Sequence, residues 1–218
     1  MTTLSGPTRD AQSGDAQSLV IFLHGYGADG NDLIGIGDVL AEHMPNTMFM
    51  APNAPERSVM NPMGYQWFPI PRLDGSTEAQ MQAGFDAAVT SLNDFLDQAE
   101  AETGIPPAQT CLVGFSQGTM MSLHVAPRRE TPYAGIVGFS GRLLVPERLE
   151  EEVKVRPPVL LVHGDMDDMV PPSDMPKAAE ALTGAGFQVA THVSRGVGHG
   201  IAPDGLGLAL RFMQDRLG

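Results

Sequence analysis

An apolar run that ends in Gly-x-Ser-x-Gly is the feature that most constrains how this chain can fold. Residues 112–118 read Leu-Val-Gly-Phe-Ser-Gln-Gly, with Ser116 at the centre of the motif. This order predicts a buried strand, a sharp turn and a helix, in which Gly114 and Gly118 avoid clashes that larger residues would make. The apolar pattern at 119–125 suits the buried helix that should follow. The motif therefore predicts a nucleophile elbow that lifts Ser116 above a sheet.

A serine nucleophile needs a general base, and the base needs an acid to orient it. Downstream of the elbow, a wholly apolar run at 159–162 predicts another buried strand, and an acidic loop with Asp165, Asp167 and Asp168 follows it. Asp165 is expected to brace that loop by accepting backbone hydrogen bonds. His199 lies later, in a loop rich in glycine. The order serine, acid, histidine is thus met, with Asp167 and Asp168 as rivals for the acid.

Among the six histidines, His199 combines a glycine-rich loop with the required chain order. The others fall within helical stretches, within a strand, or at strand ends directly before glycine. Packing, surface or backbone-bonding roles are expected there: His24, His43, His124, His163 and His192.

Backbone amides should stabilise the oxyanion that forms during acyl transfer. One is the amide of Gln117, directly after the nucleophile. The other is expected in the glycine-rich loop after an early strand at 19–23, where the amide of Tyr26 is the best candidate. The loop lacks the Gly-Lys-Ser/Thr of a phosphate-binding loop, and Asp29 and Asp32 would repel a pyrophosphate. A nucleotide site is therefore not expected.

Composition narrows the classes of partner. Thirteen basic against 26 acidic residues give a net charge of −13, which argues against nucleic acid or an anionic membrane as partner. No segment reaches the length of a membrane span, and residues 1–17 lack the apolar core of a secretory signal. These residues are expected to form a polar tail before a single catalytic domain at 18–218. Cys111 is the one cysteine, which excludes an intramolecular disulfide, and its apolar strand suggests an inert buried thiol. Neither a cofactor nor a metal is expected.

Strands and helices are expected to alternate, which predicts an α/β protein with a mostly parallel central sheet flanked by helices. The helix at 77–101 has the clearest signal, a capping box from Thr77 and Gln80. No span is left for a separate lid domain, and 52–76 should be an ordered loop or a short extra hairpin. Strands are expected near 17–24, 47–51, 109–115, 134–139, 158–163 and 187–193, and helices near 31–43, 77–101, 117–126, 173–184 and 203–217.

Aromatic and methionine side chains in the 52–76 loop are candidates for the wall of a substrate pocket, because methionine can repack around different acyl chains. The alternative is that they anchor a long loop to the core. The candidates are Met63, Tyr65, Trp67 and Phe68, together with Met169 beside the acidic loop.

Five ordered motifs are similar to those of the phospholipase/carboxylesterase family of α/β-hydrolases, which includes acyl-protein thioesterases and small bacterial carboxylesterases. They are Leu-His-Gly-Tyr-Gly-Ala-Asp-Gly-Asn-Asp, Ala-Pro-Asn-Ala-Pro, Gly-Phe-Ser-Gln-Gly, His-Gly-Asp-Met-Asp-Asp-Met-Val-Pro and Gly-His-Gly. The resemblance implies an α/β-hydrolase fold with Ser116 as nucleophile, Asp167 as acid and His199 as base. It also places Tyr26 and Gln117 at the oxyanion-hole positions and allows a homodimer.

The function expected from the residues and the resemblance is that of a cytoplasmic serine carboxylesterase acting on small-molecule esters or thioesters with short to medium acyl groups. Acyl-protein thioesterase or lysophospholipase activity is the alternative within enzymes, and a dienelactone-type hydrolase is a further one that is disfavoured because such enzymes usually carry Cys at the position of Ser116. Outside enzymes, a catalytically silent α/β-hydrolase scaffold that binds a ligand or partner is the alternative. Relatives usually carry a smaller or aliphatic residue at the position of Tyr26, and they commonly have Arg and Asp near the positions of Gln66 and Pro69. Substrate preference is therefore not transferred from the family.

Overall fold

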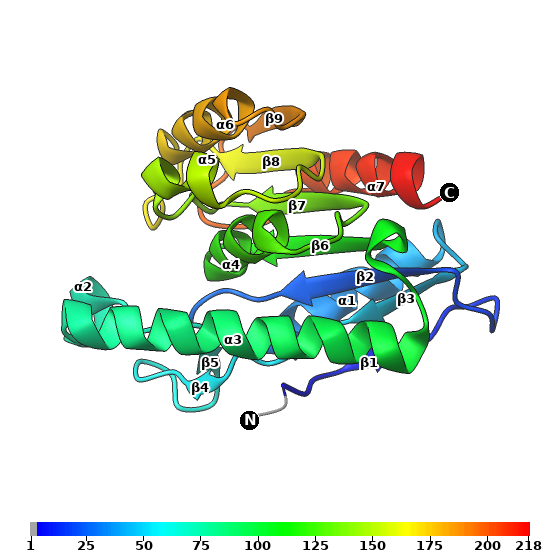
Figure 1. Ribbon diagram of the computed structural model, residues 1–218, viewed down its shortest axis with the longest axis horizontal. Helices are drawn as coiled ribbons and strands as arrows, with labels where there is room; N and C mark the ends of the chain where they lie inside the picture. The colour runs from blue at the N-terminus through cyan, green and yellow to red at the C-terminus, as the bar shows by residue number, and fades with distance from the viewer. Residues whose placement is uncertain (1–3) are drawn as a thin grey trace.

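A twisted seven-stranded sheet forms the centre of the computed structural model, which describes residues 4–218 (Figure 1). The strand order is β1-β3-β2-β6-β7-β8-β9, and only β1 runs antiparallel to its neighbour. The predicted α/β architecture with a mostly parallel sheet is confirmed. The strands are β1 Thr8–Arg9, β2 Ser18–Leu23, β3 Thr47–Met50, β6 Thr110–Phe115, β7 Gly135–Phe139, β8 Val159–Gly164 and β9 Val189–Ser194.

Helices cover both faces of the sheet, as Figure 1 shows. Helices α1 (Gly30–Ala41) and α7 (Pro203–Leu217) pack on one face, and α3 (Glu78–Thr103), α4 (Gln117–Val125) and α6 (Asp174–Gly184) pack on the other. Two helices of a single turn, α2 (Pro71–Asp74) and α5 (Leu149–Glu152), lie in the connections.

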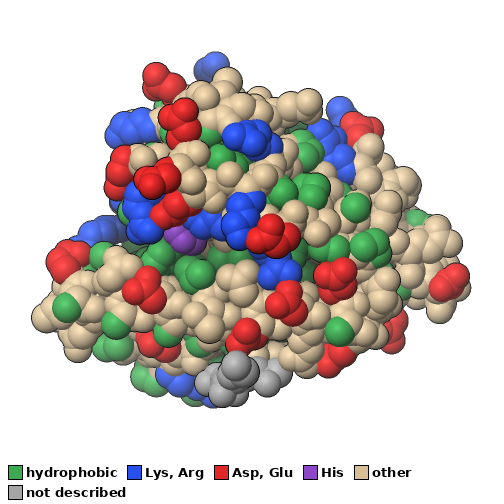
Figure 2. All heavy atoms as spheres, viewed as in Figure 1, with side chains coloured by type: hydrophobic (Ala, Val, Ile, Leu, Met, Phe, Trp, Pro, Cys, Tyr) green, Lys and Arg blue, Asp and Glu red, His purple; other side chains and the backbone are tan. Residues whose placement is uncertain are grey.

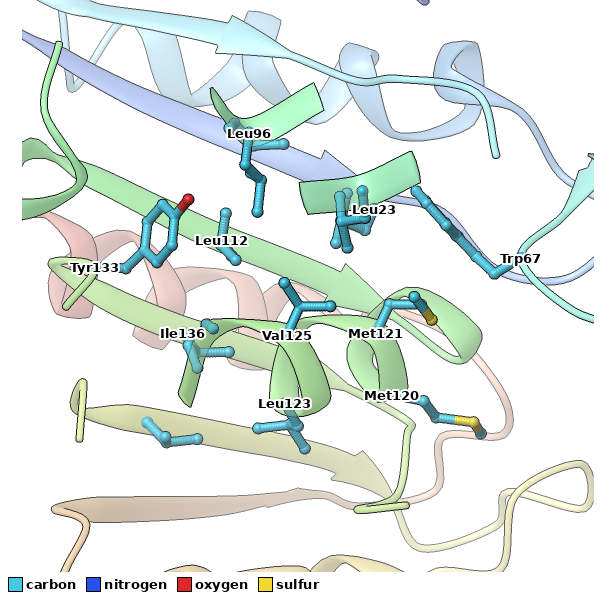
Figure 3. Packing of buried hydrophobic residues seen from close by; sticks show 14 of the residues in the cluster. Leu23, Trp67, Leu96, Leu112, Met120, Met121, Leu123, Val125, Tyr133 and Ile136 are labelled. Atoms are coloured by element: carbon cyan, nitrogen blue, oxygen red, sulfur yellow. The ribbon is translucent and has the colours of Figure 1, made fainter. Parts of the chain in front are cut away.

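Alternate side chains of β2 enter the two halves of the core. Leu19, Ile21 and Leu23 face the layer of α3, α4 and α6, whereas Val20 and Phe22 face the layer of α1 and α7. A central parallel strand is covered on both sides, so a continuous apolar run is stable there. Figure 3 shows the first of these layers, in which Leu123 and Val125 of α4 pack beside the strands that carry Leu112 and Ile136.

The longest helix begins and ends where the sequence predicts. The side chain of Thr77 accepts a hydrogen bond from the Gln80 amide and the Gln80 side chain accepts one from the Thr77 amide, which completes the capping box. Gly104 ends the helix at φ 69°, a left-handed conformation that glycine adopts without strain. Leu92 and Leu96 of this helix are buried in the core.

Two pairings of strands add to what the sequence indicates. Part of the expected N-terminal tail forms β1, which pairs with β3 at the edge of the sheet, while residues 1–3 of that tail lie outside the described residues. The long loop contains the short hairpin that was one of its two expected forms, made by β4 (Glu56–Arg57) and β5 (Tyr65–Gln66).

Cys111 is fully buried, and burial raises the pKa of its thiol to about 12, as expected for an inert residue. None of the helices at 4–218 is long and apolar enough to cross a membrane.

Candidate active site

Ser116 sits on a strained turn between β6 and α4, at the carboxyl end of the sheet. Its backbone has φ 54° and ψ −114°, a conformation that residues with a side chain rarely adopt. The turn requires glycine on both sides of the serine, because glycine has no Cβ. A Cβ at position 118 would overlap the carbonyl of Leu23, and one at position 114 would overlap the backbone of Gly118 and Thr119. The local geometry is therefore that of a nucleophile elbow.

The side chain of Gln117 ties the long loop to this elbow. Its Oε1 accepts a hydrogen bond from the Trp67 amide at 3.1 Å, and its Nε2 donates to the Phe68 carbonyl at 2.8 Å. The Trp67 indole also donates to the carbonyl of His24 at 2.9 Å. The loop after β2, the long loop and the elbow are thus joined through backbone groups.

His199 and Asp167 meet across the ends of β8 and β9. Nδ1 of His199 lies 2.8 Å from Oδ2 of Asp167, whose side chain is fully buried. Because the carboxylate accepts, Nδ1 carries the proton and Nε2 keeps its lone pair. The ring of His199 packs on Phe115, the residue before the serine, with 4.8 Å between ring centroids. Within residues 4–218 no hydrogen bond joins Ser116 to His199, and such contacts commonly tighten only when substrate binds.

Several donors surround the Asp167 carboxylate. Its Oδ1 accepts from the amides of Met169 and Val170, both at 2.9 Å, and Nε2 of His163 lies 3.1 Å from Oδ2. Burial by itself raises the pKa of this carboxyl. The hydrogen bonds from His199 and from the two amides outweigh burial, so its pKa lies below the ordinary value. Asp167 is therefore ionised at neutral pH.

This lowered pKa predicts an acid-dependent loss of stability. A carboxyl whose pKa is lowered by folding contributes stability above its unfolded pKa, and that contribution is lost as pH falls from about 3.8 through the lower folded value. The variant Asp167→Asn cannot titrate, so its free energy of unfolding should fall less steeply across this acidic window than that of the wild type. Urea unfolding at a series of acidic pH values measures both profiles, with Asp168→Asn at the exposed neighbour as the matched control. Parallel profiles for wild type and Asp167→Asn would contradict the assignment.

The rival aspartates and the strand-end histidines have structural contacts. Asp165 accepts a hydrogen bond from the Gly196 amide at 2.6 Å, which is the bracing predicted for it, and Asp168 is exposed. Nδ1 of His24 lies 2.7 Å from the Gly25 carbonyl, and Nε2 of His163 lies 3.0 Å from that of Val170. Both histidines bond the backbone, as predicted from their positions before glycine.

Tyr26 and Gln117 both border the cavity that Ser116 lines. In the described part of the chain, neither amide donates a hydrogen bond to a protein acceptor. The Tyr26 side chain extends to the last residue of α2, where its hydroxyl donates to Oδ2 of Asp74 at 3.0 Å. The same oxygen accepts from the Ile70 amide at 2.8 Å, so the phenol is fixed against the wall of the cavity.

The cavity has a volume of about 510 Å³ and is lined mostly by apolar side chains. They come from α1, from the long loop and α2, from α3 and α4, and from the loops after β7, β8 and β9. Its side chains include Leu33, Ile36, Phe68, Ile70, Leu73, Met81, Phe115, Met120, Leu144, Met169, Val170 and Ile201, with Asp32, Arg72 and Arg142 as charged members.

Only part of the predicted pocket wall lies at this cavity. Phe68 and Met169 line it, but Tyr65, Trp67 and Met63 do not. Trp67 is fully buried, at the end of the core that holds Leu23, Met120 and Met121 (Figure 3). Its two hydrogen bonds, from the amide to Gln117 and from the indole to the His24 carbonyl, hold it there. Met63 is 80% exposed at the hairpin tip, and the Tyr65 ring packs under the guanidinium of Arg57. For these three residues the alternative of a loop anchor or a surface position fits better.

Sequence reasoning missed the larger part of the wall. Met120 lies one helical turn after Ser116 and Ile201 lies two residues after His199, so their spacing from the predicted residues was a usable signal. Leu33 and Ile36 on α1 offered no such signal, since a cavity-facing stripe looks like a core-facing one. Among residues 4–218, no three His, Cys, Asp or Glu side chains gather as metal ligands.

Comparison with known proteins shows to which family this chain belongs. The model of the Phospholipase/Carboxylesterase family matches residues 10–217. The chain is a member of the phospholipase/carboxylesterase family. The family predicted by resemblance is thereby confirmed.

Named members resemble the chain over most of their length. Acyl-protein thioesterase 1 of Gibberella zeae is 30% identical over 211 residues, covering 91% of this chain and 90% of the relative. Esterase YpfH of Escherichia coli (strain K12) is 29% identical over 199 residues, covering 91% of this chain and 83% of the relative. The crystal structure of esterase PE8 matches with a TM-score of 0.94 and 46% identity, covering 99% of this chain and all of that chain. The α/β-hydrolase fold is confirmed, and the chain is a carboxylesterase- and acyl-protein thioesterase-like hydrolase.

Proposed function

We propose that this family member hydrolyses short- to medium-chain acyl esters through a triad of Ser116, His199 and Asp167. The observation that carries the proposal is the cavity into which the elbow serine and His199 both open, with His199 held by a buried, ionised Asp167 at 2.8 Å. A serine hydrolase needs these three groups in this order of contact.

The reaction proceeds in two acyl transfers. Nε2 of His199 takes the proton of Ser116 while Oγ bonds to the ester carbonyl carbon, and the carbonyl oxygen becomes an oxyanion. As the intermediate collapses, the C–O bond of the leaving alcohol breaks and the alcohol takes the proton from Nε2. A water molecule then repeats both steps on the acyl-enzyme and frees Ser116. Asp167 holds the imidazole in the tautomer that makes Nε2 the base.

The amides of Tyr26 and Gln117 would stabilise the oxyanion. Each belongs to a segment that is held in place, Tyr26 through its bond to Asp74 and Gln117 through its bonds to the long loop. A donor fixed before the reaction begins needs no reorganisation when charge develops, and each is worth about 3–4 kcal/mol in comparable enzymes.

Size and polarity of the cavity support short to medium acyl groups. Its volume of about 510 Å³ lies within the range usual for small-molecule sites, and its apolar lining suits an alkyl chain. The whole catalytic unit proposed here is a single domain at 18–218, without a lid domain. A cytoplasmic location and a homodimer stay predictions.

A thioesterase is the second candidate, because acyl-protein thioesterase 1 is a relative with 30% identity. A thioester carbonyl reacts by the same steps with a thiol as leaving group, so the triad alone does not separate the two activities.

The test is a series of p-nitrophenyl esters from acetate through octanoate to palmitate, measured beside an S-acylated peptide. We expect kcat/KM to be highest at or below octanoate, and comparable values for acetate and palmitate would refute the chain-length proposal. Hydrolysis of the peptide alone would favour the thioesterase. Folded protein that hydrolyses neither substrate and whose Ser116 takes no label from a fluorophosphonate would be a silent scaffold.

A further inference from the structure

Two arginines line the cavity. Arg72 belongs to α2, and Arg142 lies in the loop after β7. A Cβ at Gly141 would lie 3.0 Å from the carbonyl oxygen of Ser116, so Arg142 leaves the backbone directly beside the nucleophile. Nη2 of Arg72 donates to the carbonyl of Met169 at 2.8 Å, two residues beyond Asp167. The Arg72 guanidinium is therefore held by the loop that carries Asp167, and Arg142 extends from a backbone segment beside Ser116.

Neither guanidinium is saturated by carboxylates. In the part of the chain that the structure describes, Arg72 has no carboxylate within ion-pair distance, and its one hydrogen bond goes to a neutral carbonyl. Nε of Arg142 lies 3.2 Å from Oδ2 of Asp174 without forming a hydrogen bond, and Asp174 is shared with Lys177 at 3.3 Å. Arg128 provides the contrast, since its Nε bonds Glu152 at 2.7 Å in good geometry. Donor capacity thus remains at the cavity.

The other charged groups near the cavity do not cancel these arginines. Asp32 lines the cavity from α1 without forming an ion pair with either arginine among the described residues, and the Asp167 carboxylate is occupied by His199 and two amides. Asp74, next to α2's end, is occupied by the Tyr26 hydroxyl and two backbone amides. The charged side chains that line the cavity are therefore one acidic residue, on α1, and two arginines from other segments.

General basicity does not explain this arrangement. The chain has 26 acidic and only 13 basic residues, and acidic and basic side chains are mixed on the face shown in Figure 2. What distinguishes Arg72 and Arg142 is that both line one mostly apolar cavity. A guanidinium binds a carboxylate through a planar pair of donors, and the attraction is stronger where apolar walls exclude water.

We propose that the cavity selects esters that carry a carboxylate, which Arg142 and Arg72 bind while the ester carbonyl lies at Ser116. Monoesters of dicarboxylic acids, or esters of carboxylated alcohols, are the chemical class that meets this description. This inference deepens the proposed ester hydrolysis and rests on it. The two sources of the carboxylate, acyl group and leaving group, are distinguished by the experiment.

Two matched substrate pairs test the proposal. The first pair is p-nitrophenyl hydrogen adipate and p-nitrophenyl hexanoate, which differ by a carboxylate at the end of the acyl chain. The second is 4-hexanoyloxybenzoate and its methyl ester, which differ by a carboxylate on the leaving group. For each pair the readout is the ratio of kcat/KM for the anionic ester to that for the neutral one, which corrects for general effects of a substitution on catalysis.

The variants are Arg142→Gln, Arg72→Gln and their combination, with Arg211→Gln on the exposed side of α7 as the matched control. Each cavity substitution should lower the ratio about 3- to 10-fold in one of the two pairs, mainly through KM, and the double variant should lower it further. High sodium chloride should lower the wild-type ratio but leave that of the double variant unchanged. Arg211→Gln should keep the wild-type ratio.

The possible results distinguish failure of the arginine site from failure of the proposed ester hydrolysis. If the double variant keeps the wild-type ratio in both pairs while neutral esters are still hydrolysed, the arginine site is refuted and the esterase stands. If folded wild-type protein hydrolyses no ester of either pair, the proposed function fails and the inference fails with it.

Discussion

Replacing Ser116 by alanine should lower kcat on ester substrates by about 10⁴- to 10⁶-fold, because the only covalent nucleophile of the proposed mechanism is lost. The residual rate would come from the oxyanion donors and from substrate binding. The free energy of unfolding should change little, since alanine keeps the Cβ and the same strained backbone at φ 54°. Initial rates on p-nitrophenyl butyrate, together with urea unfolding, measure both quantities.

Ser140→Ala is the matched control for this prediction. Ser140 is also a buried serine at positive φ, 46°, and its hydroxyl has no hydrogen-bond partner among the described residues. It does not line the cavity, so its variant should keep most of the activity. A Ser116→Ala protein that retains more than about 1% of the wild-type kcat would refute Ser116 as nucleophile. Loss of activity in both variants would indicate a general effect on the fold.

Replacing Gly118 by alanine should prevent the chain from folding stably. The added Cβ would overlap the carbonyl group of Leu23 at the end of β2. Both partners of this clash are backbone, so no side chain can move aside, and α4 would have to separate from the sheet. We expect a loss of about 3 kcal/mol or more in the free energy of unfolding, and with it the loss of activity. Urea unfolding followed by far-ultraviolet circular dichroism measures the change.

Gly35→Ala is the control for helix propensity. Gly35 lies in the middle of α1 with nothing within 4 Å of an added Cβ, so alanine should stabilise the protein by about 0.5–1 kcal/mol. If the two glycine substitutions change the free energy of unfolding in opposite directions, the effect at Gly118 comes from close packing at the elbow and not from the general effect of glycine in helices. A Gly118→Ala protein with an unchanged unfolding midpoint would show that the elbow tolerates a side chain.

The parallel sheet and the elbow could be predicted from sequence because their causes are local. Buried strands such as Val159–Gly164 need continuous apolar runs, and the tight turn at Ser116 needs glycine at fixed offsets. The strand Thr8–Arg9 could not be predicted, because both residues are polar and exposed and the free edge of β3 determines their pairing. Chemistry alone left the acid open between Asp167 and Asp168, since both follow the same strand and only tertiary contact with His199 distinguishes them.

The cavity wall was harder to predict because the type of a residue does not determine whether its side chain points into the cavity or into the core. Trp67 and Phe68 are adjacent aromatic residues, yet Trp67 is drawn beneath the site by its hydrogen bonds to His24 and Gln117 while Phe68 lines the cavity. Arg72 and Arg142 form no sequence pattern, because they are 70 positions apart and only the folded loops bring both to the same cavity.

The contacts of Gln117 have a consequence for how such an enzyme can diversify. Gln117 holds the long loop through the amide of Trp67 and the carbonyl of Phe68, groups that every residue type other than proline provides. The attachment therefore does not depend on the side chain at Phe68, which lines the cavity. Successive substitutions there could change which substrates are accepted while the nucleophile and its neighbouring amide keep their geometry. In directed evolution, position 68 is therefore a site for variation, provided that Gln117 is retained.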